Sequence, residues 1–359
     1  MSRFTPLRVA EIRPETDDCV AVRLDVLAEQ AAAFAWTPGQ HLILKAQVGG
    51  EELRRTYSIC SASPADGLWI AVKRQPQGRF SGHVNADLKV GDVIEAMPPA
   101  GRFFVPLEPN AARTHVAIAA GSGITPVLAI VAATLASEPK SRFVLLYGNR
   151  TTASIIFREQ LEDLKNRYMT RLSLHHVLSA EPQEIPLHDG RIDAAKIDLL
   201  CRHIVDPKTV DAWYLCGPAP MIGDVSSALE VQGVERRRIH FEYFTTEGNT
   251  PRQRMLGPAV VESVKDAADV TVLVEGRRID FKLPYNERSL LDAALDAGAD
   301  LPFACKGGVC CTCRTKLVEG KVAMAANYAL EDWELEQGFI LACQARPLTD
   351  RVVVDYDQV

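Results

Sequence analysis

The sequence predicts three consecutive modules, an antiparallel β-barrel, a doubly wound α/β domain and a small α+β domain. The first hundred residues hold short β-rich runs separated by turn signals, which is typical of a barrel. The next part alternates apolar strands with helical stretches, and the last part has a cluster of cysteines after a hairpin and a helix. We expect the modules at 1–108, 109–245 and 268–359, with a glycine- and proline-containing linker over 246–267.

Composition and charge narrow the class of protein. The chain has 359 residues, of which 47% are hydrophobic and 24% charged, as in folded proteins of two or three domains. A net charge of −6 argues against a nucleic-acid partner, because such binding depends on basic patches. The most apolar stretch, from His115 to Ala136, is interrupted by Gly121, Gly123 and Pro126, so we expect no membrane span. The first residues lack the apolar region of a secretory signal, and we expect a cytoplasmic protein.

The expected elements of the first module are five short strands. They are Leu7–Ile12, Val20–Val26, His41–Ala46, Leu68–Lys73 and Asp92–Ala96. Arg55, Tyr57 and Ser58 stand at the end of a further barrel strand. A flavin needs a cation for its phosphate, an aromatic face for its ring and a hydroxyl near its reactive nitrogen, and these three residues can supply them. By themselves, such residues are more often ordinary sheet surface.

Two segments are candidates for holding phosphates. Gly78-Arg79-Phe80-Ser81 offers a turn and a helix start with free backbone N–H groups. Gly121-Ser122-Gly123-Ile124-Thr125-Pro126 lies between the apolar run His115–Ala120 and the helical stretch Pro126–Ala136. Its glycines allow close approach of a pyrophosphate, although a lone glycine-rich turn is also compatible with a tight strand–helix connection. A second strand-end segment, Cys216-Gly217-Pro218, follows about ninety residues later.

The rest of the second module alternates in the same way. The expected elements are the strands Arg142–Tyr147, Ser173–Leu178 and Ala212–Cys216 and the helix Phe157–Tyr168. This alternation predicts a parallel, doubly wound sheet whose sites lie at the carboxyl ends of its strands. Arg150 follows the second strand, where a ribose 2′-group would lie. An arginine there suits the 2′-phosphate of NADPH, although NADH remains possible and a solvated surface arginine is the alternative.

The third module begins with a hairpin, Val270–Val274 and Arg278–Leu283, turning at Glu275-Gly276, and a helix, Ser289–Ala297. Its cysteines follow the pattern C-x4-C-x2-C…C, which is that of plant-type [2Fe–2S] proteins. The pattern predicts four iron ligands, Cys305, Cys310, Cys313 and Cys343. Cys311 falls between two ligands and is interpreted as a spare, buried residue. Zinc is the alternative, but it usually takes two short-spaced pairs, and the second half offers Cys343 without a nearby histidine.

These motifs resemble the ferredoxin–NADP reductase superfamily. The matching pieces are Arg-x-Tyr-Ser at 55–58, Gly-x-x-Ser at 78–81, Gly-x-Gly-x-x-Pro at 121–126, Cys-Gly-Pro at 216–218 and Glu-Tyr-Phe at 242–244. The C-terminal module resembles plant-type ferredoxins, which implies a β-grasp fold. A closer likeness, to the reductase components of bacterial multicomponent di-iron monooxygenases, is carried by Phe34 and by 38–41, 51–58, 147–150 and 304–309.

The resemblance implies roles for individual residues. FAD would be held by Arg55, Thr56, Tyr57, Ser58, Lys73, Gly78 and Ser81, with Phe244 over part of the flavin. The nicotinamide dinucleotide would be held by Gly121, Gly123, Thr125, Pro126, Arg150 and Gly217. The catalytic residues would be Ser58, Cys216 and Glu242, with Ser58 near the flavin's reactive nitrogen and Cys216 beside the nicotinamide.

The order of modules predicts an electron path. A nicotinamide gives two electrons as a hydride and a [2Fe–2S] cluster accepts one at a time, so a flavin must stand between them. We therefore expect an NAD(P)H-dependent reductase that passes electrons through FAD and the cluster to the oxygenase component of a multicomponent oxygenase. The alternatives are a reductase of another aromatic-ring oxygenase or redox partner, and a non-enzymatic ferredoxin-type carrier.

Overall fold

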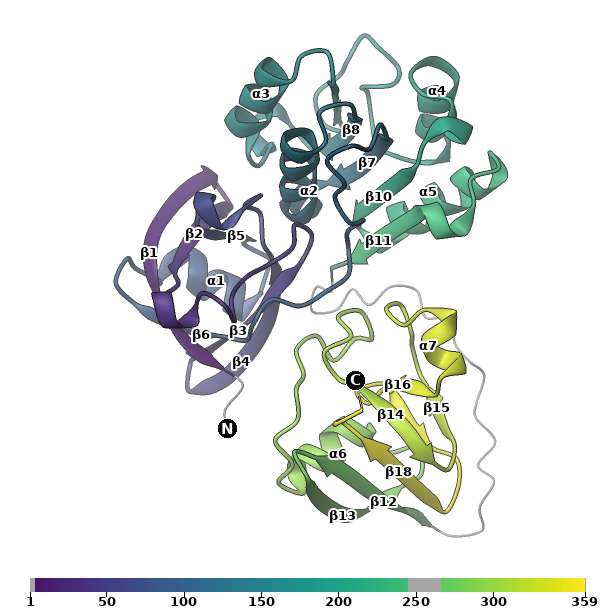
Figure 1. Ribbon diagram of the computed structural model, residues 1–359. Helices are drawn as coiled ribbons and strands as arrows, with labels where there is room; N and C mark the ends of the chain where they lie inside the picture. The colour runs from purple at the N-terminus through teal and green to yellow at the C-terminus, as the bar shows by residue number, and fades with distance from the viewer. Residues whose placement is uncertain (1–3, 245–265, 359) are drawn as a thin grey trace. The chain divides into compact units, whose positions relative to one another are not determined.

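The structure is a computed structural model that describes residues 4–244 and 266–358, and it divides into two compact units, Met1–Thr246 and Glu247–Val359 (Figure 1). The expected linker, 246–267, lies outside the described residues except for its last two positions. Within the described residues, the first unit holds a six-stranded and a five-stranded sheet, and the second holds a five-stranded sheet and a two-stranded one, β15-β17.

The first sheet is an antiparallel barrel with the strand order β4-β3-β6-β1-β2-β5. The strands are β1 (Thr5–Thr16), β2 (Cys19–Asp25), β3 (His41–Val48), β4 (Glu51–Ser58), β5 (Leu68–Lys73) and β6 (Val93–Ala96). A bridge between Ile59 and Ile70 connects the two ends of the row. The short helix α1 (Arg79–Ala86) buries Phe80 and Val84 in the barrel core, which fixes its N-terminus beside the end of β5.

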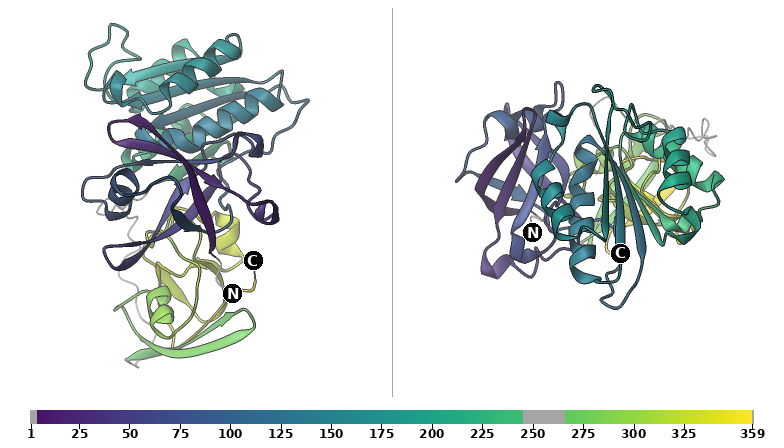
Figure 2. Two further views of the ribbon diagram at one scale, coloured as in Figure 1. Left: turned by 90° about the vertical axis from the view of Figure 1, so that its left-hand side faces the viewer. Right: turned by 90° about the horizontal axis from the view of Figure 1, so that it is seen from above.

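The second sheet is parallel and has helices on both faces (Figure 2). Its order is β11-β10-β7-β8-β9, from β7 (Thr114–Ala120), β8 (Arg142–Asn149), β9 (Leu172–Leu178), β10 (Ala212–Gly217) and β11 (Ile239–Tyr243). Helices α2 (Ile124–Ser137) and α3 (Arg158–Arg167) share one apolar core with this sheet and with barrel residues. Helices α4 (Ala194–His203) and α5 (Ala219–Val231) cover the other face.

The direction of winding reverses between β7 and β10. The chain leaves β7 toward β8 and β9 on one side, whereas β10 and β11 lie on the other. In open parallel sheets a ligand crevice forms at such a reversal, outside the carboxyl ends of the strands. The segments after these two strands begin at Gly121 and Pro218, so both predicted nucleotide segments lie at this point.

The second unit is an α+β fold built on a mixed five-stranded sheet, β13-β12-β18-β14-β16. Its elements are β12 (Ala267–Val274), β13 (Arg277–Pro284), α6 (Leu290–Asp296), β14 (Arg314–Glu319), β15 (Val322–Met324), α7 (Asp332–Glu336), β16 (Phe339–Leu341), β17 (Ala345–Pro347) and β18 (Arg351–Asp355). The predicted hairpin is confirmed as the antiparallel pair β12–β13, with Glu275 and Gly276 at its turn. The predicted helix is confirmed as α6, capped by the Ser289 hydroxyl.

The predicted strands and helices are confirmed with small shifts of their ends, and several elements were not predicted. Helix α2 begins at Ile124, two residues before the expected start, so Pro126 lies within its first turn. The unpredicted elements include α4, α5, β11 and most strands after the cysteine loop. Six short 3-10 turns complete the first unit: Ala28–Gln30, Pro64–Asp66, Gly121–Gly123, Thr152–Ser154, Pro207–Thr209 and Arg236–Arg238. Within the described residues, no helix has the length and apolar character needed to cross a membrane.

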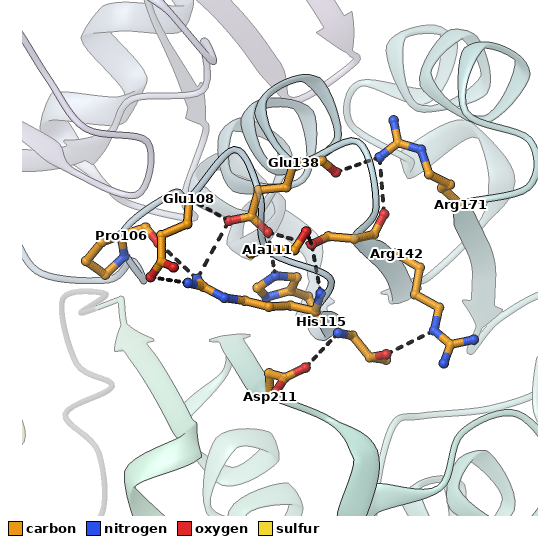
Figure 3. A network of polar contacts seen from close by, with 11 residues as sticks. Pro106, Glu108, Ala111, His115, Glu138, Arg142, Arg171 and Asp211 are labelled. Atoms are coloured by element: carbon orange, nitrogen blue, oxygen red, sulfur yellow. Dashed lines mark hydrogen bonds and ion pairs between the residues drawn. The ribbon is translucent and has the colours of Figure 1, made fainter.

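A buried carboxylate, Glu138, ties the connection between barrel and parallel sheet to the end of α2 (Figure 3). The Glu108 N–H donates to Glu138 Oε1 at 2.9 Å, and the Ser141 hydroxyl donates to Oε2 at 2.6 Å. Arg113 Nη1 lies 3.6 Å from Oε1 and His115 Nε2 lies 3.5 Å from Oε2. Burial opposes ionisation, but the hydrogen bonds from Ser141 and Glu108 outweigh it and lower the pKa of Glu138. Burial also lowers the pKa of His115, which is therefore a neutral neighbour of this carboxylate at pH 7.

Replacing Glu138 with alanine should therefore destabilise the first unit by about 3 kcal/mol, because Arg113 and the Ser141 and Glu108 donors lose a buried acceptor. Urea unfolding followed by tryptophan fluorescence measures the loss, since Trp213 is fully buried in this unit. Glu184→Ala, at an exposed loop position, is the matched control and should leave the midpoint in place. Equal midpoints for the two variants would contradict the role given to Glu138.

Candidate functional site

Three predicted catalytic residues come together in the first unit, from positions far apart in the sequence. The Ser58 hydroxyl, at the end of β4, donates to Glu242 Oε2 at 2.8 Å. Glu242 lies on β11 opposite Cys216 on β10 in the parallel register. Cys216 is fully buried, and its burial, together with the Glu242 carboxylate, raises the pKa of the thiol far above its usual range. The thiol is therefore neutral, and the Glu242 carboxylate is the charge nearest to Ser58 that a bound ligand would meet.

The predicted flavin residues line the same end of β4. Arg55 and Tyr57 are half-buried, and the Tyr57 ring packs against Phe80 of α1 with centroids 5.7 Å apart. Thr56 Oγ1 is buried and has no hydrogen-bond partner within the described residues. Lys73, at the end of β5, lies 3.5 Å from Asp18. An aromatic face, cations and an unsatisfied buried hydroxyl fit a flavin and its phosphates.

The turn before α1 presents backbone donors rather than side chains. Ser81 Oγ accepts from the Gln75 N–H at 3.1 Å and donates to the Gly78 carbonyl at 3.3 Å. A Cβ on Gly78 would lie 2.6 Å from Ser81 Oγ, so this tight turn requires glycine. The first N–H groups of α1 have no acceptor within the helix and remain available to an anion. Ser81 therefore shapes the turn, and the N–H groups fit a pyrophosphate.

The two glycines of the nucleotide loop have different surroundings. A Cβ on Gly123 would lie 2.1 Å from the Cys216 carbonyl oxygen, so close packing of this loop against β10 requires glycine there. Gly121 has a φ of +53° and open space at its Cβ position, and its carbonyl accepts from the Tyr147 hydroxyl at 3.0 Å. Thr125 is buried and its hydroxyl donates to the Ser122 carbonyl at 3.0 Å. The open side of the loop at Gly121 therefore fits a dinucleotide.

The remaining predicted residues border this region. A Cβ on Gly217 would lie 2.7 Å from Met221 Cε and 3.1 Å from Ala120 Cβ, so Gly217 is closely packed. Arg150 directly follows β8, and its exposed side chain makes no ion pair within the part of the chain that the structure describes. Phe244 is half-buried and packs against the core that the barrel shares with the parallel sheet.

The four predicted iron ligands form two pairs in the second unit. The neighbouring Cys310 thiol lowers the pKa of Cys305 to about 6, and the neighbouring Cys313 thiol lowers the pKa of Cys343. Within the described residues, no three His, Cys, Asp or Glu side chains converge as tightly as one metal ion requires. Two pairs fit a [2Fe–2S] cluster, because each of its two irons takes two thiolates.

Hydrogen-bond donors already surround these sulfur atoms. The Gly307 N–H donates to Cys305 Sγ at 3.3 Å, and the Thr312 hydroxyl donates to Cys310 Sγ at 3.1 Å. Gln344 Nε2 donates to Cys343 Sγ at 3.5 Å. Such donors stabilise thiolates and tune the potential of a cluster.

Cys311 is oriented differently. Its φ of +53° places it in the left-handed region, and its thiol donates to the Ala329 carbonyl at 3.1 Å. Its thiol therefore contacts the segment before α7, and Cys311 is half-buried rather than buried as predicted.

Sequence reasoning missed one residue that the structure places at the site. His41 is the first residue of β3, is 4% exposed, and has Nδ1 3.5 Å from Glu242 Oε1. The segment 38–41 contributed to the family likeness, but no role was predicted for His41, which begins an apolar strand after Pro38-Gly39-Gln40. A histidine at the first position of a strand is common, and Glu242, its neighbour in the structure, lies 201 positions later in the sequence.

This fold and these sites define a class of protein, a flavin- and nicotinamide-dependent reductase with its own iron–sulfur module. Three family models match: the oxidoreductase FAD-binding domain over residues 6–105, the oxidoreductase NAD-binding domain over 117–227 and the 2Fe-2S iron-sulfur cluster binding domain over 272–348. The chain is thus an NAD(P)H-dependent oxidoreductase with FAD and [2Fe–2S] domains.

Full-length relatives specify the family. The chain is 45% identical over 357 residues to a subunit of the 1,2-phenylacetyl-CoA epoxidase of Escherichia coli K12, covering 99% of both chains. It is 33% identical over 358 residues to the ferredoxin reductase component of the 3-ketosteroid-9-alpha-monooxygenase of Rhodococcus rhodochrous, covering 99% of this chain and 97% of that one. The chain therefore belongs to the family of three-module reductase components of multicomponent oxygenases, which confirms the resemblance to such reductases.

A solved structure has the same architecture. Phthalate dioxygenase reductase, a modular structure for electron transfer from pyridine nucleotides to [2Fe–2S], superposes with a TM-score of 0.57 over 98% of both chains. The sequence identity is 24%, so this likeness concerns the fold.

The cysteine loop places Cys310, a predicted iron ligand, next to Cys311, which is predicted not to bind iron. Cys311→Ala should keep the cluster's visible absorption and one-electron reductase activity, because a half-buried non-ligating cysteine behaves as a small apolar residue. Cys310→Ala should lose the cluster and keep FAD, because the two belong to separate units. Iron content and visible spectra of the purified variants measure both effects. A bleached Cys311→Ala beside an intact Cys310→Ala would show that the ligand register is displaced by one residue.

Proposed function

We propose that this chain is the reductase of a phenylacetyl-CoA epoxidase, passing electrons from NADPH through FAD and [2Fe–2S] to that oxygenase in the cytoplasm. The observation that carries the proposal is the 45% identity to one subunit of such an epoxidase, over 99% of both chains. The three modules would bind the electron donor NADPH, the flavin and the [2Fe–2S] cluster, so the chain has a site for each carrier on this electron path.

We further propose the roles predicted for the site residues. Arg55, Thr56, Tyr57 and Lys73 would hold FAD at the end of the barrel, with its pyrophosphate on the N–H groups after Gly78. The dinucleotide would lie over Gly121 at the reversal point, with Arg150 at its ribose. Support comes from the contacts that bring Ser58, Glu242 and Cys216 together and from the packing of Gly123 against Cys216. The module limits 1–108, 109–245 and 268–359 are part of the same proposal.

The bound flavin would take two electrons together and release them singly, which is the chemistry that the two ends of the path require. The protein's part is positioning. The Ser58 hydroxyl proton is engaged by Glu242, so the Ser58 oxygen offers lone pairs to its ligand. The neutral, buried Cys216 offers an uncharged surface beside it, which suits a nicotinamide ring. The close packing at Gly123 fixes the loop against this surface.

A second candidate partner is another oxygenase. The 33% identity to a ketosteroid monooxygenase reductase over nearly the full length favours this alternative over a carrier without flavin. The matches to both the FAD-binding and the NAD-binding domains argue against such a carrier.

An anaerobic titration with NADPH tests the path. The purified protein should bleach both flavin and cluster absorption, with three electrons taken up per chain, two by FAD and one by the cluster. Adding the phenylacetyl-CoA oxygenase component together with phenylacetyl-CoA and air should then reoxidise the protein and yield epoxide, whereas a ketosteroid oxygenase component in its place should yield none. Bleaching without coupling to the phenylacetyl-CoA oxygenase would leave a reductase of a different acceptor.

Arg150→Ala should lower kcat/KM for NADPH about tenfold and leave the value for NADH unchanged, because a charge-assisted contact to a phosphate contributes about 1.4 kcal/mol or more. Initial rates with a one-electron acceptor measure both constants. Arg167→Ala, at an exposed position at the end of α3, is the matched control and should change neither. Equal kcat/KM for the two cofactors in the wild type would refute the proposed selectivity.

A further inference from the structure

His41 is a buried histidine that the described structure leaves without hydrogen-bond partners. It is 4% exposed, and neither Nδ1 nor Nε2 makes a hydrogen bond within the described residues. A buried polar group without a partner costs free energy, so such a group is retained where it has a further role. Its location gives the role, because Nδ1 lies 3.5 Å from Glu242 Oε1.

The backbone around His41 holds its ring in place. His41 pairs with Ser58 across β3 and β4, and it exchanges two backbone hydrogen bonds with Ala100, at 2.8 and 2.9 Å. A Cβ on Gly101 would lie 2.9 Å from His41 Nδ1, so the ring occupies the space beside a glycine whose φ is +107°. The imidazole is therefore confined between β4 and the segment that ends at Gly101.

The two oxygens of Glu242 thus face two barrel residues. Oε2 accepts from the Ser58 hydroxyl at 2.8 Å, and Oε1 faces His41 Nδ1 at 3.5 Å. The Glu242 side chain is 13% exposed, and a largely buried carboxylate with one donor has lone pairs left without a partner. A second donor, an imidazole N–H, satisfies the other oxygen and fixes the orientation of the carboxylate.

We propose that His41 is a positioning residue that donates from Nδ1 to Glu242 and thereby keeps this carboxylate on the Ser58 hydroxyl. Ser58 then presents its lone pairs to the ligand in every cycle, since its one proton is engaged by Glu242. The inference rests on the proposed function, in which Ser58 and Glu242 border the flavin. His41 is thereby added to Ser58 and Glu242 as a third residue of the site, and it acts on the reacting atoms only by orienting Glu242.

A pair of variants isolates the nitrogen that matters. The amide nitrogen of asparagine overlaps Nδ1 of histidine and that of glutamine overlaps Nε2, so His41→Asn keeps the donor and His41→Gln displaces it. At saturating NADPH, His41→Gln should reduce its flavin about tenfold more slowly than the wild type, with unchanged FAD content and unchanged Kd for NADPH. His41→Asn should restore the rate to within about threefold. Equal rates for the two variants would overturn the proposal, and so would an Asn variant slower than the Gln variant.

A spectroscopic comparison reports on the contact without turnover. In the holoenzyme labelled with ¹⁵N-histidine, the resonances that His41→Asn removes identify the His41 ring. They should show the proton on Nδ1, and Glu242→Gln should shift them. A ring protonated only at Nε2, or one indifferent to Glu242→Gln, would overturn the contact. If the wild type binds FAD but NADPH does not reduce it, the proposed function falls, and the ¹⁵N comparison alone decides on His41.

Discussion

The close packing of Gly123 against the Cys216 carbonyl sets the geometry on which the rest of the site depends. No Cβ fits between them, so the loop after β7 and the end of β10 approach as backbones, at the point where the sheet reverses its winding. Gly217, the residue after Cys216, is also closely packed, against Met221 and Ala120. Both glycines thus face packed protein atoms. Gly121 has open space for a ligand at its Cβ position, and its carbonyl accepts a hydrogen bond from the Tyr147 hydroxyl.

The second constraint acts between barrel and sheet. A carboxylate on the last strand of the parallel sheet takes a hydrogen bond from a barrel hydroxyl, Ser58, so neither module contains the site by itself. Glu138 fixes the opposite end of the same boundary, where it binds the connecting segment through the Glu108 N–H. Glu138 therefore stabilises the junction, while Glu242 lies at the proposed reaction site. The first is saturated by donors and the second is not, which is the distribution expected if the second also serves a ligand.

Local pattern predicted much of this fold and the composition of its sites. The barrel strands, the parallel strands and the C-x4-C-x2-C loop each carry their signal within a few residues, and each was found near its predicted ends. Helices α4 and α5 and strand β11 were not predicted from the sequence, although α4 and α5 bury an apolar face against the sheet as the predicted helices do. Motifs identified Ser58, Cys216 and Glu242 singly, but their convergence is a property of the packed sheets. His41 was missed for the same reason, since its partner is distant in sequence and only burial makes its unpaired nitrogens informative.

The chain leaves the first unit beside its proposed flavin site. Glu242 and Phe244 belong to the last described segment of that unit, and β12 of the second unit begins at Ala267, so only residues 245–266 separate the two. A covalent tether makes electron transfer between the units intramolecular and independent of protein concentration. The proposed cluster site, by contrast, needs only its own unit, because its four predicted ligands lie between Cys305 and Cys343 and the donors to their sulfur atoms come from Gly307, Thr312 and Gln344. The proposed flavin site therefore depends on the packing of two modules, whereas the proposed cluster site is formed within one short stretch of a single unit.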